Sequence, residues 1–85
     1  MQLKETSKFQ KSRKKLKELP EKEALKEAIS GILSNPEAGK RLKGEFKDLR
    51  SLRYSVKGQQ RRLIYKIAGH DLTLFSFGPR EGIYK

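Results

Sequence analysis

The apolar positions in the first half of the chain recur at helical spacing. Phe9, Leu16 and Leu19 follow Ser7, a residue type that suits the N-cap of a helix. Pro20 then interrupts the pattern, and proline is well tolerated in the first turn of a new helix. The stripe of that second helix has the spacing i, i+3, i+4, i+7 and i+8 and comprises Leu25, Ala28, Ile29, Ile32 and Leu33. Residues 7–34 are therefore predicted to form a hairpin of two helices with one apolar side to bury.

The pattern changes to alternation in the second half of the chain. The first predicted strand, within LRSLRYSVK, turns Leu52, Tyr54 and Val56 to one side. In the second, RRLIYKI, one side comprises Leu63, Tyr65 and Ile67, and the other comprises Arg62, Ile64 and Lys66. We expect a turn at GQQ between these strands, and a second turn at AGHD before a third strand, LTLFSF. Gly78-Pro79 ends or bends this strand, because proline cannot donate a hydrogen bond to a neighbouring strand.

Together these segments predict one α+β domain that comprises residues 1–85. A helical hairpin packs on an antiparallel sheet of three strands, or of four if the short stretch QLKET at residues 2–6 joins it. Residues 35–48 are expected to form a connector. Tyr54 and Tyr65 alternate with aliphatic residues and are assigned to the core. The sheet face away from the helices is expected to carry Arg53, Lys57, Arg62 and Lys66.

The charge of the chain points to a polyanionic partner. It holds 21 Lys and Arg residues against 10 Asp and Glu, a formal net charge of +11. Such an excess suits a nucleic acid, an acidic protein or an anionic membrane surface. Between Leu49 and Gly69 there is no acidic residue, and the basic ones are Arg50, Arg53, Lys57, Arg61, Arg62 and Lys66. This second half is predicted to carry the binding face, whereas the first half reads as solvated helix surface.

The composition argues against whole classes of site. The chain has no cysteine, which excludes disulfides and thiolate metal sites, and its only histidine, His70, lies in a predicted turn. No metal or cofactor is therefore predicted. No apolar run reaches the roughly 20 residues of a membrane span. The start, MQLKETSKFQ, lacks an apolar signal segment, and we expect a cytoplasmic protein without a membrane partner.

The last residues, FGPREGIYK, add an arginine and a tyrosine to the cations of the sheet. RNA cleavage needs a base for the ribose 2′-hydroxyl, positive charge near phosphorus and an acid for the leaving oxygen. Arginine supplies the charge through its planar fork, but it is a poor acid or base because its pKa exceeds about 12. Tyr84 beside Arg53, Arg62 and Arg80 could stack on an unpaired base, or transfer a proton if these cations lowered its pKa. On residue chemistry alone, simple RNA binding is favoured over catalysis.

The order of these motifs resembles the RelE/ParE superfamily of type II toxin–antitoxin toxins. The resemblance covers essentially the whole chain and is carried by LKGEFKDLRSLRYSVKGQQRRLIYKI followed by LTLFSFGPREGIYK. The family pattern has a glycine in the connector, matched by Gly44, and a basic residue on the first long strand, matched by Arg53. The later motifs are matched by Arg62-Leu63-Ile64-Tyr65 and by Gly78, Arg80 and Tyr84.

The RelE branch of this superfamily implies an mRNA interferase: an endoribonuclease that cuts mRNA in the ribosomal A site without a metal ion and so inhibits translation. By position, Arg62 and Arg80 would hold the scissile phosphate, Arg53 would act on the phosphate or the 2′-hydroxyl, and Tyr84 would stack or help proton transfer. The further predicted RNA contacts are Arg50, Lys57, Arg61, Lys66 and Lys85. The implied partners are a cognate antitoxin, the ribosome and mRNA, with the toxin alone a monomer.

This chain departs from the family pattern at three positions. Pro79 stands where many relatives carry a histidine, Arg53 replaces a lysine of some active members, and Ser51 falls where some have a second lysine. The group that takes the proton is thus left open. Two other functions remain: a ParE-like inhibitor of DNA gyrase, which shares the fold without needing this set of arginines and tyrosine, and a non-catalytic RNA-binding module.

Overall fold

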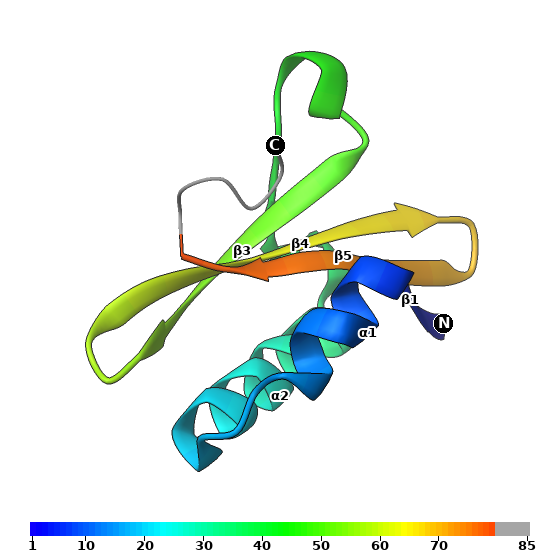
Figure 1. Ribbon diagram of the computed structural model, residues 1–85. Helices are drawn as coiled ribbons and strands as arrows, with labels where there is room; N and C mark the ends of the chain where they lie inside the picture. Colours follow the sequence, from blue (N-terminus) through cyan, green and yellow to red (C-terminus); the bar gives the residue numbers. More distant parts are fainter. Residues whose placement is uncertain (80–85) are drawn as a thin grey trace.

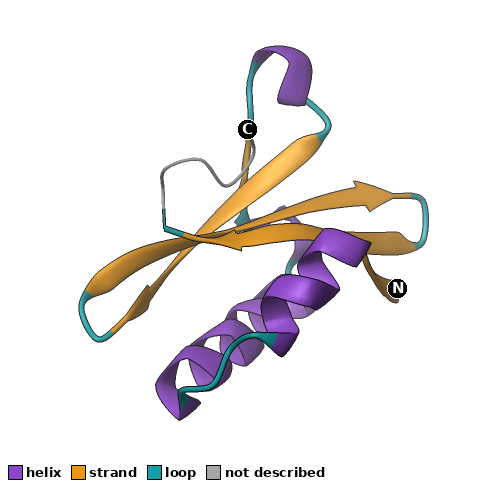
Figure 2. Cartoon of the chain, in the orientation of Figure 1, coloured by secondary structure: helices purple, strands orange, loops and turns teal. Residues whose placement is uncertain are grey.

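The computed structural model describes residues 1–79 of the chain. Two helices, α1 (Ser7–Lys14) and α2 (Leu19–Ser34), lie on the same face of a single sheet (Figure 1, Figure 2). The predicted helical hairpin is thereby confirmed. The cap of α1 differs from the prediction, since Thr6 rather than Ser7 is the N-cap and its Oγ1 accepts a hydrogen bond from Phe9 N at 3.1 Å. Pro20 lies in the first turn of α2, as expected.

Within residues 1–79 the sheet has five strands in the order β1-β5-β4-β3-β2. They are β1 (Gln2–Glu5), β2 (Lys40–Arg41), β3 (Leu49–Val56), β4 (Gln59–Ala68) and β5 (Asp71–Gly78). β1 pairs with β5 in parallel, and the other neighbours are antiparallel. The α+β prediction is confirmed, but the sheet is mixed rather than antiparallel. It also has one strand more than expected, because part of the connector pairs with β3 as β2.

Two tight turns join the three long strands. Lys57 and Gly58 form the first, with φ angles of 51° and 81°. Positive φ at both central residues is the mark of the type I′ turn, whose twist matches that of the flanking strands. The turn was predicted at GQQ but lies one residue earlier, since Gln59 already pairs with Val56. The second turn lies at AGHD as predicted, with Ala68 paired to Asp71.

The core lies between the helices and one face of the sheet. Its buried side chains are Phe9, Leu25, Ala28, Ile32, Leu63, Tyr65, Leu72 and Leu74. The ring of Phe9 meets that of Phe77 edge to face, with centroids 5.1 Å apart. Tyr65 is fully buried and Tyr54 packs against the core, which confirms the placement of both tyrosines.

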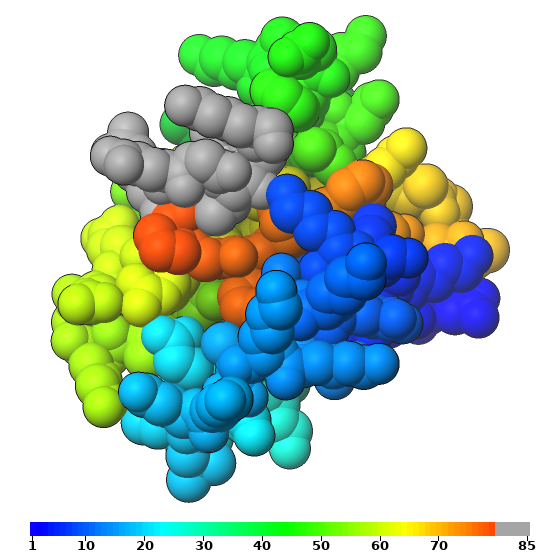
Figure 3. All heavy atoms as spheres, viewed as in Figure 1, coloured from blue at the N-terminus to red at the C-terminus, as the bar shows by residue number. Residues whose placement is uncertain are grey.

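The hydroxyl of Tyr65 fixes the connector to the sheet. It donates to Pro36 O at 2.6 Å and accepts from Gly39 N at 2.8 Å. A Cβ at Gly39 would overlap this hydroxyl, so only glycine allows the approach. The connector continues through β2 to the short 3₁₀ helix η2 (Gly44–Phe46), which lies at the end of the molecule opposite α2 (Figure 3). No element among residues 1–79 covers the second face of the sheet as the helices cover the first (Figure 1).

Candidate nucleic-acid interface

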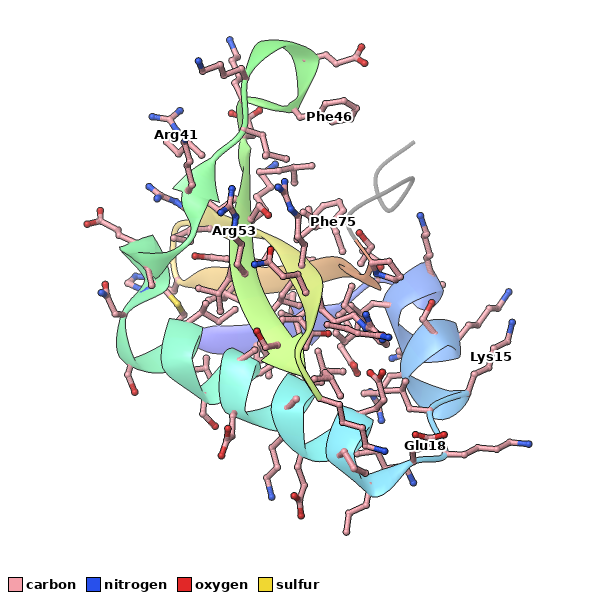
Figure 4. All side chains as sticks on the ribbon, turned by 90° about the vertical axis from the view of Figure 1, so that its left-hand side faces the viewer. Lys15, Glu18, Arg41, Phe46, Arg53 and Phe75 are labelled. Carbon is pink, nitrogen blue, oxygen red and sulfur yellow. The ribbon has the colours of Figure 1, made fainter. Side chains whose placement is uncertain are left out.

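The sheet surface turned away from the helices carries a cross-strand pair of arginines. Arg53 on β3 lies directly opposite Arg62 on β4. Their strand neighbours Leu52, Tyr54 and Leu63 pack on the helix side, and alternation therefore turns both guanidinium groups to the other side. Figure 4 shows Arg53 on this side of the sheet. The prediction that the two arginines share one face is confirmed.

Two lysines extend this pair along the sheet. Lys66 on β4 lies opposite Leu49, and Lys40 on β2 lies opposite Ser51. Directly paired residues turn their side chains to the same side of a sheet, and Leu49 and Ser51 alternate in step with Arg53 on β3. Lys40 and Lys66 therefore lie on the same side of the sheet as Arg53. We name as the basic face the surface formed by Lys40, Arg53, Arg62 and Lys66.

The charges of the basic face are not neutralised within the described part of the chain. β3 and β4 contain no acidic residue. In residues 1–79 neither Arg53 nor Arg62 has a hydrogen bond or an ion pair from its side chain. Like charges directly opposite each other on adjacent strands destabilise a sheet. An anion bound between the two guanidinium groups would relieve this repulsion, and each planar fork suits a phosphate.

Two predicted RNA contacts, Arg50 and Arg61, point to the helix side instead. Arg50 donates to Gly39 O at 2.9 Å and so ties β3 to the connector. The side chain of Arg61 is only 16% exposed and donates to Glu21 Oε1 at 3.0 Å. Each lies an odd number of residues from Arg53 or Arg62 on its own strand, which turns it to the opposite face. Their contact with RNA remains a prediction, and the structure gives both an intramolecular partner.

The remaining predicted residues are divided between the hairpin turn and the end of the chain. Lys57 was expected on the sheet face with Arg53, but β3 ends at Val56 and Lys57 lies in the type I′ turn instead. It is mostly exposed, with its Nζ 4.0 Å from Glu18 Oε2. Arg80, Tyr84 and Lys85 lie outside the described residues. Their convergence with Arg53 and Arg62 therefore stays a prediction. His70 lies exposed in the second turn, as expected.

Sequence reasoning missed two residues of this surface, Lys40 and Phe75. Lys40 belongs to a strand of two residues, too short to show alternation. Phe75 is the extra residue of a β-bulge, since β4 residues Ile64 and Tyr65 pair with Ser76 and Leu74. Only an interrupted alternation in LTLFSF, where apolar and polar positions do not follow period two, hints at such a bulge.

Among residues 1–79, Tyr54 is the group whose pKa the fold shifts most clearly, and it lies away from the basic face. Burial, and to a lesser degree the carboxylate of Glu21, raises the pKa of Tyr54 to about 12, while Arg61 lowers it. Its hydroxyl is buried and has no hydrogen-bond partner within the described residues. A phenol with a raised pKa is a poor base at neutral pH. Tyr54 is thus a core residue, not a candidate for proton transfer.

Metal binding and membrane insertion find no support in residues 1–79. Within this range there is no group of three or more His, Cys, Asp or Glu side chains that could hold a metal ion. No described helix has the length and apolarity needed to cross a membrane.

The motifs and the fold agree with a single protein family. Residues 3–85 match the family model of the ParE-like toxin of type II bacterial toxin–antitoxin systems. The chain belongs to this family. The resemblance to the RelE/ParE superfamily drawn from the sequence motifs is thereby confirmed. A search of curated protein sequences found no match.

Solved structures of RelE share the fold of this toxin. A chain of the intact E. coli RelBE toxin–antitoxin complex superimposes with a TM-score of 0.73 at 25% identity, covering 94% of this chain and 96% of that one. The isolated E. coli RelE toxin gives 0.73 at 23% identity, covering 98% and 87%. A free E. coli RelE with two arginines replaced by alanine gives 0.70 at 24% identity, covering 94% and 83%.

Proposed function

We propose that this toxin is a RelE-type mRNA interferase, which cuts mRNA in the ribosomal A site without a metal ion. The observation that carries the proposal is the cross-strand pair of Arg53 and Arg62, which has no neutralising partner among residues 1–79 and lies on the sheet face away from the helices. Family membership and the likeness to RelE structures support it. The toxin would act in the cytoplasm as a monomer on translating ribosomes, and would thereby stop translation.

The chemistry assigns each arginine a role in charge stabilisation. When the ribose 2′-oxygen attacks the adjacent phosphorus and the 5′-oxygen leaves, negative charge grows on the phosphoryl oxygens. Arg53 and Arg62 can donate to these oxygens from two sides, and removal of one such donor typically costs about 100- to 1,000-fold in rate. Both stay protonated at neutral pH. Proton transfer thus requires another group, and Tyr84 with Arg80 remains the predicted completion of the site.

Primer extension on an mRNA under translation in a purified system tests this function. We would compare the wild type, Arg62→Ala and Lys22→Ala, a control that removes a cation from the helix side. Cuts at codon boundaries that require ribosomes, persist in Lys22→Ala and fall at least a hundredfold in Arg62→Ala are expected. Cuts on naked RNA would contradict ribosome dependence. Binding to RNA without any cut would contradict the interferase and support a non-catalytic RNA-binding module.

Inhibition of DNA gyrase is the second candidate function. It is favoured by one observation, that the matching family model is that of the ParE-like toxins. A gyrase supercoiling assay with the wild type and Arg62→Ala separates the two. Loss of supercoiling in both proteins, with no cut in translated mRNA, would replace the interferase by a gyrase inhibitor.

We further propose that a cognate antitoxin docks on the helical hairpin. A groove of about 480 Å³ runs between the helices, with an apolar floor that includes Leu16, Leu25 and Ile29. Its rim is basic and comprises Arg13, Lys14, Lys22 and Lys26. This combination suits an amphipathic helix with acidic flanks. The double change Lys22→Glu with Lys26→Glu should weaken antitoxin binding at least tenfold in calorimetry, while Lys66→Glu on the basic face should not.

A further inference from the structure

A β-bulge in β5 turns an aromatic side chain to the basic face. Phe75 is the unpaired residue of this bulge, between Leu74, which pairs with Tyr65, and Ser76, which pairs with Ile64. Leu74 belongs to the core on the helix side, and the next residue of the strand therefore points the other way. Bulges are over-represented next to active sites, where they re-aim a side chain.

The bulge is held by the same threonine that caps the first helix. Thr6 Oγ1 donates to Phe75 O at 3.2 Å and accepts from Phe9 N at 3.1 Å. Thr6 N donates to Leu74 O at 3.0 Å. The hydroxyl of Thr6 is thus bonded both to the bulge and to the first turn of α1, and its backbone N–H adds a second bond to β5. The position of Phe75 follows from a rigid scaffold rather than from a loop.

Phe75 lies on the same side of the sheet as the arginine pair and outside the core. It is partly exposed and is not among the side chains packed against the core cluster. Ile64, across from the bulge on β4, is fully buried and supports this part of the basic face. Ser76, the strand neighbour of Phe75, pairs with Ile64. Arg62, two residues from Ile64 on the same side of β4, is therefore the diagonal neighbour of Ser76, and such neighbours are about 7–8 Å apart, within reach of long side chains. Figure 4 shows Arg53 and Phe75 on the same side of the sheet.

We infer that Phe75 is a base-stacking residue for the RNA whose phosphate Arg53 and Arg62 hold. The inference rests on the proposed function. Cations that bind the phosphate, next to an aromatic surface that takes an unpaired base, are the usual combination for single-stranded RNA. The basic face supplies the cations, and Phe75 on the same side of the sheet supplies the aromatic surface. β3 and β4 contain no acidic residue that would compete for the cations. Phe75 thus positions the nucleotide next to the scissile phosphate, independently of Tyr84.

The test uses two substitutions of Phe75 and two substrates. Phe75→Leu keeps an apolar side chain and removes the ring, whereas Phe75→Tyr keeps the ring. Each is assayed with the wild type on ribosome-bound mRNA that has an intact A-site codon, or the same codon with one base removed to leave the ribose and phosphate. Thermal melts followed by circular dichroism establish that the variants are folded.

The expected result is a loss that depends on the base. On intact mRNA, Phe75→Leu should lower kcat/KM about tenfold, as the loss of one stacked base implies, and Phe75→Tyr should cut like the wild type. On mRNA without the stacked base, the wild type and Phe75→Leu should cut equally slowly. Equal rates on intact mRNA, or an equal loss on both substrates, would overturn the inference.

An Arg62→Ala control separates this failure from failure of the proposed function. If the wild type cuts, Arg62→Ala does not and Phe75→Leu matches the wild type, then the interferase stands and the stacking role falls. If the wild type itself makes no cut on translating ribosomes, the proposed function falls and the stacking role falls with it.

Discussion

At the scale of single residues, the two core tyrosines provide a matched pair. The hydroxyl of Tyr54 is buried with no partner in residues 1–79, whereas that of Tyr65 makes two hydrogen bonds. A buried polar group without a partner costs about 1–3 kcal/mol of desolvation. Tyr54→Phe should therefore raise the free energy of unfolding by about 1 kcal/mol, and Tyr65→Phe should lower it by about 1–3 kcal/mol. Urea denaturation at neutral pH measures both, and a loss of stability in Tyr54→Phe would contradict the unpartnered hydroxyl.

Tyr54 also predicts how stability changes at high pH. Burial first, and then Glu21, raise the pKa of Tyr54 from its usual value of 10.0 to about 12 in the folded chain. The unfolded chain therefore loses this proton first as pH rises from 10 to 12, and the folded state becomes less favoured. Over this range the wild type should lose more stability than Tyr54→Phe, which has no proton to lose there. Denaturation series at pH 9, 10 and 11 would show two parallel curves if the shift were absent.

The residues also show what a sequence can reveal about a surface. The alternation of LRSLRYSVK and RRLIYKI correctly placed Arg53 and Arg62 on one face. The same alternation implied that Arg50 and Arg61 face the helices. They were nevertheless predicted to contact RNA, on the basis of their charge alone. Their partners, Gly39 O and Glu21, come from the connector and from α2, and only the tertiary fold brings these to the strands.

At the scale of secondary-structure elements, two glycines should respond to alanine in opposite directions. Gly58 has φ +81° in the type I′ turn, where an L side chain is strained whatever the space. Gly31 lies within α2, and a Cβ there would meet nothing within 4 Å. Gly58→Ala should lower the free energy of unfolding by about 1 kcal/mol or more, and Gly31→Ala should raise it by about 0.5–1 kcal/mol. Thermal denaturation checks both, and changes of the same sign would contradict the assigned backbone conformations.

Thr6 links two elements through a single hydroxyl, and its removal should affect both. Thr6→Val keeps the shape of the side chain but loses the cap of α1 and the bond to Phe75 O. Loss of an N-cap costs about 0.5–2 kcal/mol, and Thr6→Val should be destabilised by about 2 kcal/mol when the second bond is included. Thr6→Ser keeps the hydroxyl and should retain most of the stability. Hydrogen exchange of the first turn of α1 provides the local measurement, and equal protection in the two variants would count against the shared hydroxyl.

The elements that escaped prediction share a physical cause. α1, α2, β3, β4 and β5 each bury one side along their length, which gives them a readable period. β1 and β2 contain four and two residues, and neither has a buried residue. The direction of β1 depends on its parallel partner β5 at the far end of the chain. The bulge at Phe75 likewise depends on Thr6, a tertiary contact that no local pattern encodes.

At the scale of the whole molecule, the cations behind the net charge of +11 include two clusters on different surfaces. One is the basic face, and the other is the rim of the groove between the helices. They lie on opposite sides of the sheet. An RNA and an acidic partner helix could thus bind without sharing a cation. Inhibition by the antitoxin would then come from steric exclusion of the complex, or from antitoxin contacts elsewhere on the toxin. It would not come from direct competition for Arg53 and Arg62.

Salt dependence can distinguish binding at the basic face from diffuse attraction to a basic protein. If Lys40, Arg53, Arg62 and Lys66 each neutralise one phosphate, log K for a single-stranded RNA should fall against log salt with a slope of about −3. The double change Arg53→Ala with Lys66→Ala should make this slope shallower by about 1.4. Fluorescence anisotropy between about 50 and 300 mM salt, a range that brackets physiological salt of about 150 mM, measures it.

The matched control for that measurement removes two cations from the opposite side of the molecule. Lys22→Ala with Lys26→Ala lowers the net charge by the same two units but alters only the groove rim. Because exposed charges more than a Debye length of about 8–10 Å from the RNA are screened, this variant should keep the wild-type slope. An equal change of slope in the two double variants would mean that RNA is attracted by total charge. It would contradict the basic face as the binding surface.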